Sequence, residues 1–425
     1  MSTGSPVLSS PTGEGTGLGR FFLALEVRPY RWLWGASFFG SMAFGMRSLA
    51  DGWLALTLTD SPFWVGAAAG VQGLGQVVFG VFGGVLVDRL DRRKTLMAAQ
   101  VATATLVLLI GLLVLVGRIA LWHLLSIAFL QGLLMALQMP AANALIYQVV
   151  GPRRLLNAMA ARMLAFNITR IVGSVVAGAL ISRFGVEACY LFAAGSLYLS
   201  PALLLFVKGN FRSEQIREPF WQAAREGIRY AWANGPVRTL LTMSVLMETF
   251  GFSYHVMLPV MARDVLNVGA SGLGMLSAVG GAGAMVSTVA VAGLGDFKNK
   301  GALLVAGAGL AGVAILLFAL SPWYPVSLGL AAVIGATLMA YDATMGTALQ
   351  LLSSDAVRGR VLGMYGLTFG FTPLGGLLSG AIATMASAPV GIGLGGIAIV
   401  AFVLGRGRKL VRLLLAEQRV IRGPD

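Results

Sequence analysis

Six ionisable residues interrupt long apolar stretches of this sequence, and their side chains are the ones best placed to do chemistry. They are Arg47, Asp51, Arg162, Arg170, Glu248 and Asp342. One charge near the centre of a membrane-spanning helix costs roughly 2.5–3.5 kcal/mol, so six unpaired charges would cost about 15–20 kcal/mol. These side chains must therefore pair with one another or face a wet cavity, where they could carry protons or contact a bound molecule.

Two of the acidic residues have a polar partner on their own segment. Arg47 and Asp51 are four residues apart, so they share one helix face and can form an ion pair. A carboxylate held by a cation is a poor proton carrier, and we interpret this pair as structural or gating rather than as a substrate contact. Glu248 and His255 are seven residues apart, on one face but about 10 Å apart along the axis, and could border one polar track.

Asp342 has no basic residue three or four positions away. Its carboxyl group must pair with Arg47, Arg162 or Arg170 on another helix, bind a cationic group, or take up a proton. We place the proton-carrying site at Asp342 first and at Glu248 second, with a static ion pair between helices as the alternative for each. Further polar and aromatic candidates at similar depth, for which a hydrogen bond between helices is the simpler role, are Gln131, Gln138, Asn143, Tyr254 and Tyr341.

The composition indicates an all-α integral membrane protein. Of 425 residues, 57% are hydrophobic and 11% are charged, against about 45–50% and about 25% in soluble domains. The apolar residues come in long blocks, of which residues 95–117 carry no charge. A helix of about 20 such residues spans the roughly 30 Å hydrocarbon layer of a membrane.

The apolar blocks predict twelve transmembrane helices in two six-helix bundles. The expected spans are 31–59, 63–87, 95–117, 121–149, 157–182, 186–208, 237–262, 271–295, 301–320, 324–351, 358–384 and 388–405. The domains follow as a tail (1–30), the first bundle (31–208), a linker (209–236), the second bundle (237–405) and a basic tail (406–425). Apolar residues at helical spacing predict an amphipathic helix at the membrane interface in both the linker and the basic tail; a solvated linker is the alternative.

Basic residues concentrate in alternate connections between the blocks. If the N-terminus is cytoplasmic, 25 of the 31 Lys and Arg lie on the cytoplasmic side and three lie in outside connections. This bias predicts that both termini are cytoplasmic. Because the net charge of +14 is distributed in this way, we expect a lipid bilayer rather than nucleic acid as the partner. One Cys and two His can build neither an internal disulfide nor a dedicated metal site.

The two halves of the sequence repeat weakly. Gly66 and Gly274 are 208 residues apart, and so are Asp88 and Asp296. In both halves an Asp follows a Gly-rich apolar block and basic residues come next. A parallel repeat of this kind is typical of rocker-switch transporters, whose substrate site lies between pseudo-twofold related halves near the membrane midplane.

The segment Gly84–Lys94 resembles the loop motif between the second and third spans of the major facilitator superfamily, with a Gly, three residues, Asp-Arg and then a basic pair. Other segments resemble its enterobactin/macrolide-exporter-like branch, also called transmembrane secretion effectors: Arg31–Trp34, Asn157–Ala158, Asn167–Gly173, Leu258–Leu266 and Arg358–Val361. The resemblance covers about residues 28–405. The sequence departs from the branch at Arg47, Asp51, Arg162 and Ser174.

The resemblance implies that spans one, four, seven and ten line a central cavity, and Asp51, Glu248 and Asp342 lie on three of these spans. Arg170 matches the family pattern and suits packing of span five as well as substrate binding. The resemblance also implies a latch that holds the halves closed on the cytoplasmic side in the outward-facing state. If these charges do more than set orientation, the latch residues are Gly84, Asp88, Arg89, Arg92, Arg93, Asp296 and Arg358.

The sequence contains no nucleotide-binding motif and no catalytic constellation, so we expect neither an enzyme nor a cofactor. We expect a monomeric exporter of a small amphipathic molecule (a drug, antibiotic or siderophore) in the inner membrane of a bacterium, working by alternating access and proton antiport. The alternatives are a facilitative or symport importer, a lysophospholipid flippase and a non-transporting scaffold or sensor. A titratable cavity carboxylate distinguishes an antiporter from a facilitator or a scaffold.

Overall fold

The computed structural model describes residues 23–209, 211, 229–230, 232–293, 299–353 and 355–422. Within these ranges it excludes the side chains of 23, 81–89, 292, 300, 355–356, 413 and 415–422. The regular elements in the described ranges are all helical. Ten of these helical stretches are long and apolar enough to cross a membrane.

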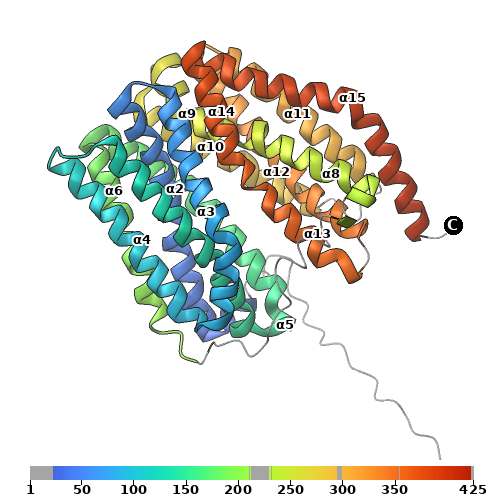
Figure 1. Cartoon of the computed structure of the whole chain (residues 1–425), viewed down its shortest axis with the longest axis horizontal. Helices are drawn as coiled ribbons and strands as arrows, with labels where there is room; N and C mark the ends of the chain where they lie inside the picture. Colours follow the sequence, from blue (N-terminus) through green and yellow to red (C-terminus); the bar gives the residue numbers. More distant parts are fainter. Residues whose placement is uncertain are drawn as a thin grey trace, which may run out of the picture.

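The first half of the chain forms one group of helices, coloured blue to green in Figure 1. A short helical turn precedes it at Leu23–Glu26. The helices of this group are α2 (Arg28–Thr59), α3 (Pro62–Arg89), α4 (Arg92–Leu115), α5 (Leu121–Phe184) and α6 (Val186–Leu204).

The second half forms the other group, coloured yellow to red. It contains α8 (Gly235–Leu246), η2 (Met247–Phe252), α9 (Tyr254–Val260), η3 (Met261–Val265), α10 (Gly269–Gly293), α11 (Lys300–Leu320), α12 (Tyr324–Leu351), α13 (Asp355–Thr368), α14 (Phe371–Met385) and α15 (Ala388–Arg422). A buried apolar cluster extends through both groups, from Ala43 in α2 to Leu414 in α15.

The helix boundaries lie close to the predicted spans, and in α5 two predicted spans follow one another without a loop. The predicted spans at 121–149 and 157–182 both lie within α5, which consists of two helices that meet at Gly151, where the backbone is not helical. Gly151 adopts φ 69°, which a glycine reaches without steric cost, and Pro152 removes a backbone donor beside it. The chain therefore bends here without an intervening loop.

Two further predicted spans contain interruptions that the sequence does not indicate. The span at 237–262 contains two π-helical segments, η2 and η3, each with a wider turn than an α-helix. The span at 358–384 is divided between α13 and α14 at Phe369–Gly370. Both interruptions lie beside residues that line the central cavity described below.

The chain beyond the bundles differs from expectation at its C-terminal end. The helix α15 continues unbroken to Arg422, where the sequence predicts a separate interfacial helix. Leu410 and Leu414 on this extension are buried, and Leu414 packs against Gly301 at the start of α11. The predicted amphipathic helix of the linker falls largely on residues 210, 212–228 and 231, which lie outside the described residues.

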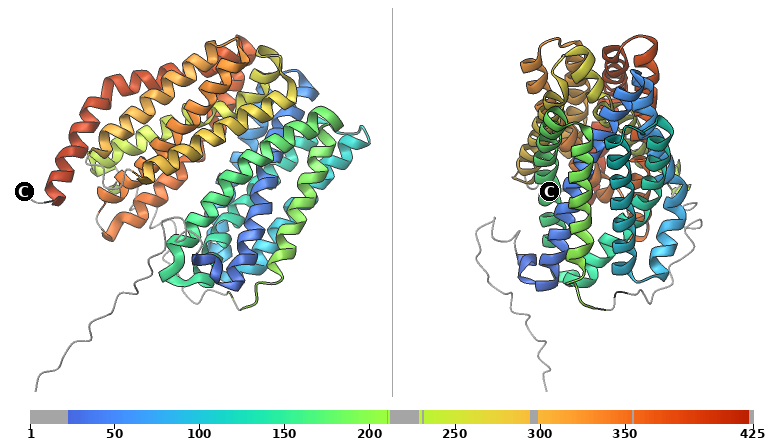
Figure 2. Two further views of the ribbon diagram at one scale, coloured as in Figure 1. Left: turned by 180° about the vertical axis from the view of Figure 1, so that it is seen from behind. Right: turned by 90° about the vertical axis from the view of Figure 1, so that its left-hand side faces the viewer.

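The two groups of helices meet at one end of the molecule and diverge towards the other (Figures 1 and 2). We call the end with the α2–α3 connection the closed end and the opposite end the open end. At the closed end, Arg263 of η3 donates to the carboxylate of Asp60 at 2.8 Å and to the Leu56 carbonyl at 3.1 Å. The Phe63 amide also donates to the Thr384 hydroxyl at 2.9 Å. These contacts join the first group to the second.

Close packing of glycines accompanies the polar contacts at the closed end. Gly66 of α3 faces the backbone of Gly376 in α14, and Gly274 of α10 faces Gly178 in α5. A Cβ atom at Gly274 would lie 2.5 Å from the Ser174 carbonyl oxygen, which is too close for any side chain. The helices can approach this closely because these positions carry no side chain.

Candidate functional site

A cavity of about 410 Å³ lies between the two groups of helices. Helices α2, α3 and α5 of the first group and η2, α9, α10, α12 and α14 of the second contribute to its wall. The ionisable residues that line it are Asp51, Arg170, Glu248, His255 and Asp342. All five are among the sequence-predicted cavity residues, and they come from segments up to about 290 residues apart in the chain.

Asp51 belongs to a hydrogen-bonded network inside the first group. Arg47 donates to its Oδ2 at 2.7 Å, and the Tyr190 hydroxyl of α6 donates to its Oδ1 at 2.8 Å. Arg47 also donates to the side-chain oxygen of Gln131 in α5, and its guanidinium lies 5.7 Å from the centre of the Phe44 ring. Arg47 is buried behind the cavity wall. The network ties α2 to α5 and α6 around one compensated charge.

We expect Arg47→Met to destabilise the protein strongly. The substitution leaves the Asp51 carboxylate buried without its cation, and breaking a buried ion pair in this way costs about 3–5 kcal/mol. The double variant Arg47→Met with Asp51→Asn removes both charges and should recover most of the loss. Thermal unfolding of the purified protein measures both effects, with the exposed Arg183→Gln as the control. Equal unfolding midpoints for Arg47→Met and the control would contradict the structural role of this pair.

The carboxylates of the second group have hydroxyl partners instead. The Tyr365 hydroxyl of α13 donates to Asp342, and the Thr372 hydroxyl of α14 donates to Glu248. Among the described residues, no Lys or Arg lies within ion-pair distance of either carboxylate. Each group can therefore gain or lose a proton without breaking an ion pair, which Asp51 cannot do.

The interruptions of the helices place these carboxylates and their partners. Glu248 lies in the π-helical segment η2, and π-turns occur frequently at functional sites because they displace a side chain from the regular helix face. Tyr365 and Thr372 stand on either side of the break between α13 and α14. This interrupted segment therefore supplies one hydroxyl to Asp342 on α12 and another to Glu248 on η2.

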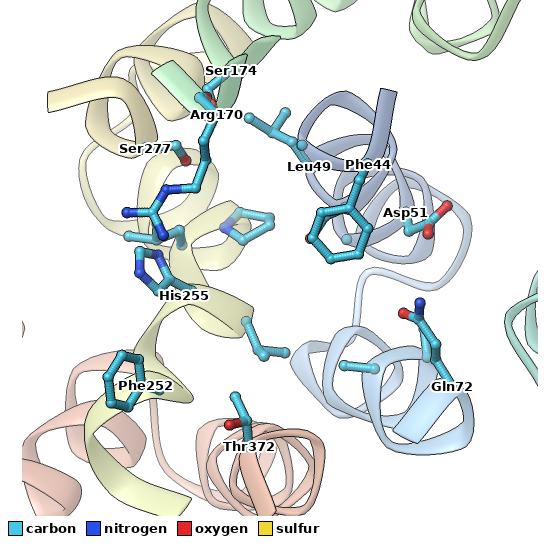
Figure 3. A pocket seen from close by; sticks show the side chains of 18 of the residues that line it. Phe44, Leu49, Asp51, Gln72, Arg170, Ser174, Phe252, His255, Ser277 and Thr372 are labelled. Carbon is cyan, nitrogen blue, oxygen red and sulfur yellow. The ribbon is translucent and has the colours of Figure 1, made fainter. Parts of the chain in front are cut away.

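Arg170 and His255 lie on the opposite part of the cavity wall from Thr372 (Figure 3). The guanidinium of Arg170 extends from α5 towards α10, where a Cβ atom at Gly281 would lie 3.5 Å from its Nε. The His255 ring packs against Tyr254, with 4.2 Å between the ring centres. Arg170 makes no ion pair with any described residue.

The remaining sequence-predicted cavity residues do not line the cavity. Arg162 donates to Asn143, which lies on the other side of the Gly151 kink in α5. Gln138 turns towards α4, where it donates to the Thr103 hydroxyl at 2.8 Å. Tyr254 and Tyr341 are buried within the second group. Arg162, Gln138 and Tyr341 thus make contacts within one half of the molecule, whereas Tyr254 is also the electrostatic neighbour of Arg170 in the other half.

Several lining residues are neutral, and sequence reasoning missed them for that reason. The aromatic ones are Phe44, Phe166, Phe252 and Phe369, and the polar ones include Ser48, Gln72, Ser277 and Thr372. A weak signal exists on α5, where Phe166, Arg170 and Ser174 recur every four residues on one face. Phenylalanines on a transmembrane helix otherwise look like ordinary lipid-facing or core residues.

Most of the predicted latch lies beyond what the structure describes. Asp296 lies outside the described residues, and for Gly84, Asp88 and Arg89 the side chains do. Arg93 donates to the Leu204 and Leu205 carbonyls at 2.8 and 3.0 Å, so it caps the end of α6 within its own group. Arg358 donates to the Gln350 and Ser353 carbonyls, also within its own group.

The other described residues of the motif are likewise bound locally. The Asp91 side chain accepts from the Lys94 amide at 2.9 Å and thereby caps α4. Arg92 is buried, and its backbone amide donates to the Phe211 carbonyl at 3.4 Å. The motif lies at the open end, where the two groups of helices diverge (Figure 2). A latch between the halves stays a prediction.

A family model described as transmembrane secretion effector matches residues 22–418. The enterobactin exporter EntS of Escherichia coli O1:K1 is 25% identical over 360 residues, which are 83% of this chain and 86% of that protein. EntS of Escherichia coli O139:H28 is 24% identical over the same length.

Solved structures with the same fold include three transporters. A crystal structure of the nucleoside transporter NupG covers 92% of this chain and all of its own, with a TM-score of 0.70 and 15% identity. A bacterial homologue of the lysosomal transporter Spinster, in an inward-facing and unoccupied conformation, covers 95% of this chain and 98% of its own, with a TM-score of 0.69 and 14% identity. A POT family transporter in complex with 5-aminolevulinic acid covers 90% and 97%, with a TM-score of 0.72 and 11% identity.

Proposed function

The chain belongs to the transmembrane secretion effector family of major facilitator transporters, and from that premise we propose that it exports a small amphipathic organic molecule by alternating access and proton antiport. The proposed substrates are drugs, antibiotics or siderophores, and siderophores are supported by the similarity to the enterobactin exporters. The proposed setting is the inner membrane of a bacterium, where the protein acts as a monomer.

The proposed topology has twelve spans in a six-plus-six arrangement with both termini cytoplasmic. Ten described stretches are apolar enough to span a membrane. Dividing α5 at Gly151 adds an eleventh span. The twelfth is α2, which is 32 residues long and carries Arg47 and Asp51. The distribution of Lys and Arg along the sequence supports a cytoplasmic open end. In that orientation the conformation is inward-facing.

The observation that carries the proposal is the cavity between the two groups of helices. Its wall combines aromatic rings with ionisable side chains, which suits a molecule with an apolar body and polar groups. Because both halves contribute to the wall, a rocking movement of the halves would expose the same site to the other side of the membrane. The contacts at the closed end are the ones that this movement must break.

The proposed coupling uses Asp342 and Glu248. Both carboxylates line the cavity, and both are held by a hydroxyl group rather than by a cation. Ionisable residues within membrane spans commonly mark proton relays in pumps and transporters. Protonation of one carboxylate and binding of the substrate would then compete for the same cavity, which is the requirement of an antiporter.

Accumulation of drugs and siderophores in cells with and without the protein tests the proposal. We expect the protein to lower the accumulation of at least one such compound, and a protonophore to abolish the difference. Higher accumulation would overturn export in favour of import. A change that survives the protonophore would overturn proton coupling, and movement of lysophospholipid alone would identify a flippase.

A further inference from the structure

Arg170 is the one side chain of the first group that brings a positive charge to the lining of the described cavity. It lies on α5 between Phe166 and Ser174, which recur at four-residue spacing and line the same wall. Figure 3 shows its guanidinium extending beside His255, with the Ser277 hydroxyl on the same side. His255 and Ser277 belong to the second group, so these three residues face one another across the boundary between the halves.

Unlike Arg170, the arginines that form ion pairs have carboxylate partners within the protein. Arg47 pairs with Asp51, Arg154 with Glu26 and Arg263 with Asp60. The guanidinium of Arg170 forms neither an ion pair nor a hydrogen bond with any residue that the structure describes. A cation in a low-dielectric cavity is costly unless an anion or an acceptor compensates it.

The acidic residues of the cavity are already engaged elsewhere. Asp51 is held by Arg47 and Tyr190. Glu248 accepts from Thr372, and Asp342 accepts from Tyr365. In Figure 3, Asp51 and Thr372 lie away from the guanidinium of Arg170. The electrostatic neighbour of Arg170 in the second group is the neutral Tyr254. None of the described carboxylates pairs with Arg170, so its guanidinium is available to an anion from outside the chain.

We propose that Arg170, with His255 and Ser277 beside it, is an anion-binding subsite for an acidic oxygen group of the transported molecule. A guanidinium presents a planar set of donors that matches a carboxylate or sulfonate, and Ser277 adds a hydroxyl donor. The apolar body of the ligand would rest against Phe44, Phe166 and Phe252 in the same cavity. The substrate class is thus an amphipathic, aromatic organic acid.

The position of this subsite between the halves gives the bound anion a role in transport, and this role rests on the proposed function. Arg170 belongs to the first half, whereas His255 and Ser277 belong to the second. An oxyanion bound between them contacts both halves at once. The ligand would therefore bind most tightly when the halves enclose it, which is how a substrate favours one conformation over another.

Two related naphthylamine probes test the charge preference. 1-Anilinonaphthalene-8-sulfonate is an organic anion, and N-phenyl-1-naphthylamine is the same skeleton without the sulfonate. We expect the wild-type protein in lipid nanodiscs, corrected for empty nanodiscs, to bind the sulfonate about tenfold or more tightly than the neutral amine. Arg170→Gln should weaken sulfonate binding by about 10- to 100-fold and leave amine binding within about twofold, because it removes charge-assisted hydrogen bonds alone. Arg170→Lys should restore part of the sulfonate affinity.

Arg162→Gln is the matched control, since Arg162 lies on the same helix but donates to Asn143 and does not line the cavity. It should bind both probes like the wild type. The inference is overturned if wild type does not prefer the sulfonate, or if Arg170→Gln weakens both probes equally while its unfolding midpoint matches the wild type. Charge-selective binding without any protonophore-sensitive export would leave the subsite standing and refute the proposed function. If Arg170→Gln exports as well as the wild type and the wild type does not prefer the sulfonate, the subsite is refuted and the proposed function stands.

Discussion

Asp342→Asn is expected to abolish proton-driven export, so that cells carrying the variant accumulate the substrate like cells without the protein. Asparagine has nearly the same shape and can still accept the hydrogen bond from Tyr365 through its amide oxygen. It cannot bind or release a proton. The substitution therefore removes the proton site and leaves the packing around α12 and α13 intact, and accumulation assays at matched expression measure the loss.

The control for this variant is Glu26→Gln. Glu26 is an exposed carboxylate whose pair with Arg154, at 3.5 Å, lies outside the cavity and contributes little. It should export like the wild type. If Asp342→Asn also exports like the wild type, Asp342 is not the proton site and the same experiment with Glu248→Gln becomes decisive. If neither Asp342→Asn nor Glu248→Gln loses activity, coupling through these carboxylates is refuted.

Gly66→Ala is expected to shift the protein away from the conformation described here and to impair export. A Cβ atom at Gly66 would collide with the backbone of Gly376, whereas nothing lies within 4 Å of the same atom at Gly80 on the same helix. Overpacking of this kind costs about 1–3 kcal/mol, which corresponds to about a 5- to 150-fold change in the balance between closed and open forms of that end. Gly80→Ala is therefore the matched control.

The shift can be measured through a cysteine placed in the cavity. Ser48 lines the cavity and is exposed there, so Ser48→Cys in a Cys189→Ser background reports access from outside the cell to a membrane-impermeant maleimide. Gly66→Ala should label at least about five times faster than its parent, and Gly80→Ala at the parental rate. Equal labelling rates in the parent, Gly66→Ala and Gly80→Ala would show that the packing of Gly66 on Gly376 does not keep the closed end shut.

The sequence predicts most of the helices because hydrophobic length is a strong signal. Most predicted spans agree with the structure to within about four residues. The direct joining of two helices at Gly151 is not predictable in this way because a Gly-Pro pair normally indicates a loop, and α5 has none there. The π-helical segments escape prediction because the hydrogen-bond shift that makes them leaves no mark in hydrophobic periodicity.

The candidate site can be predicted only in its charged members. An ionisable residue in an apolar span is rare enough to stand out, which is why the sequence by itself identifies Glu248, Asp342 and Arg170. Which of these groups lack a cation depends on contacts between distant segments, such as Tyr365 with Asp342. Arg162 shows the limit, because its partner is Asn143, on the other side of the Gly151 kink, rather than a group in the cavity.

Proton movement in liposomes that contain the purified protein tests the central claim most directly. A pH-sensitive dye trapped inside the liposomes reports protons while a gradient of a substrate found in the cell assay is imposed. Antiport predicts that protons move opposite to the substrate, and that Asp342→Asn abolishes this movement. Substrate flux with protons moving in the same direction, or with no proton movement at all, would contradict the account.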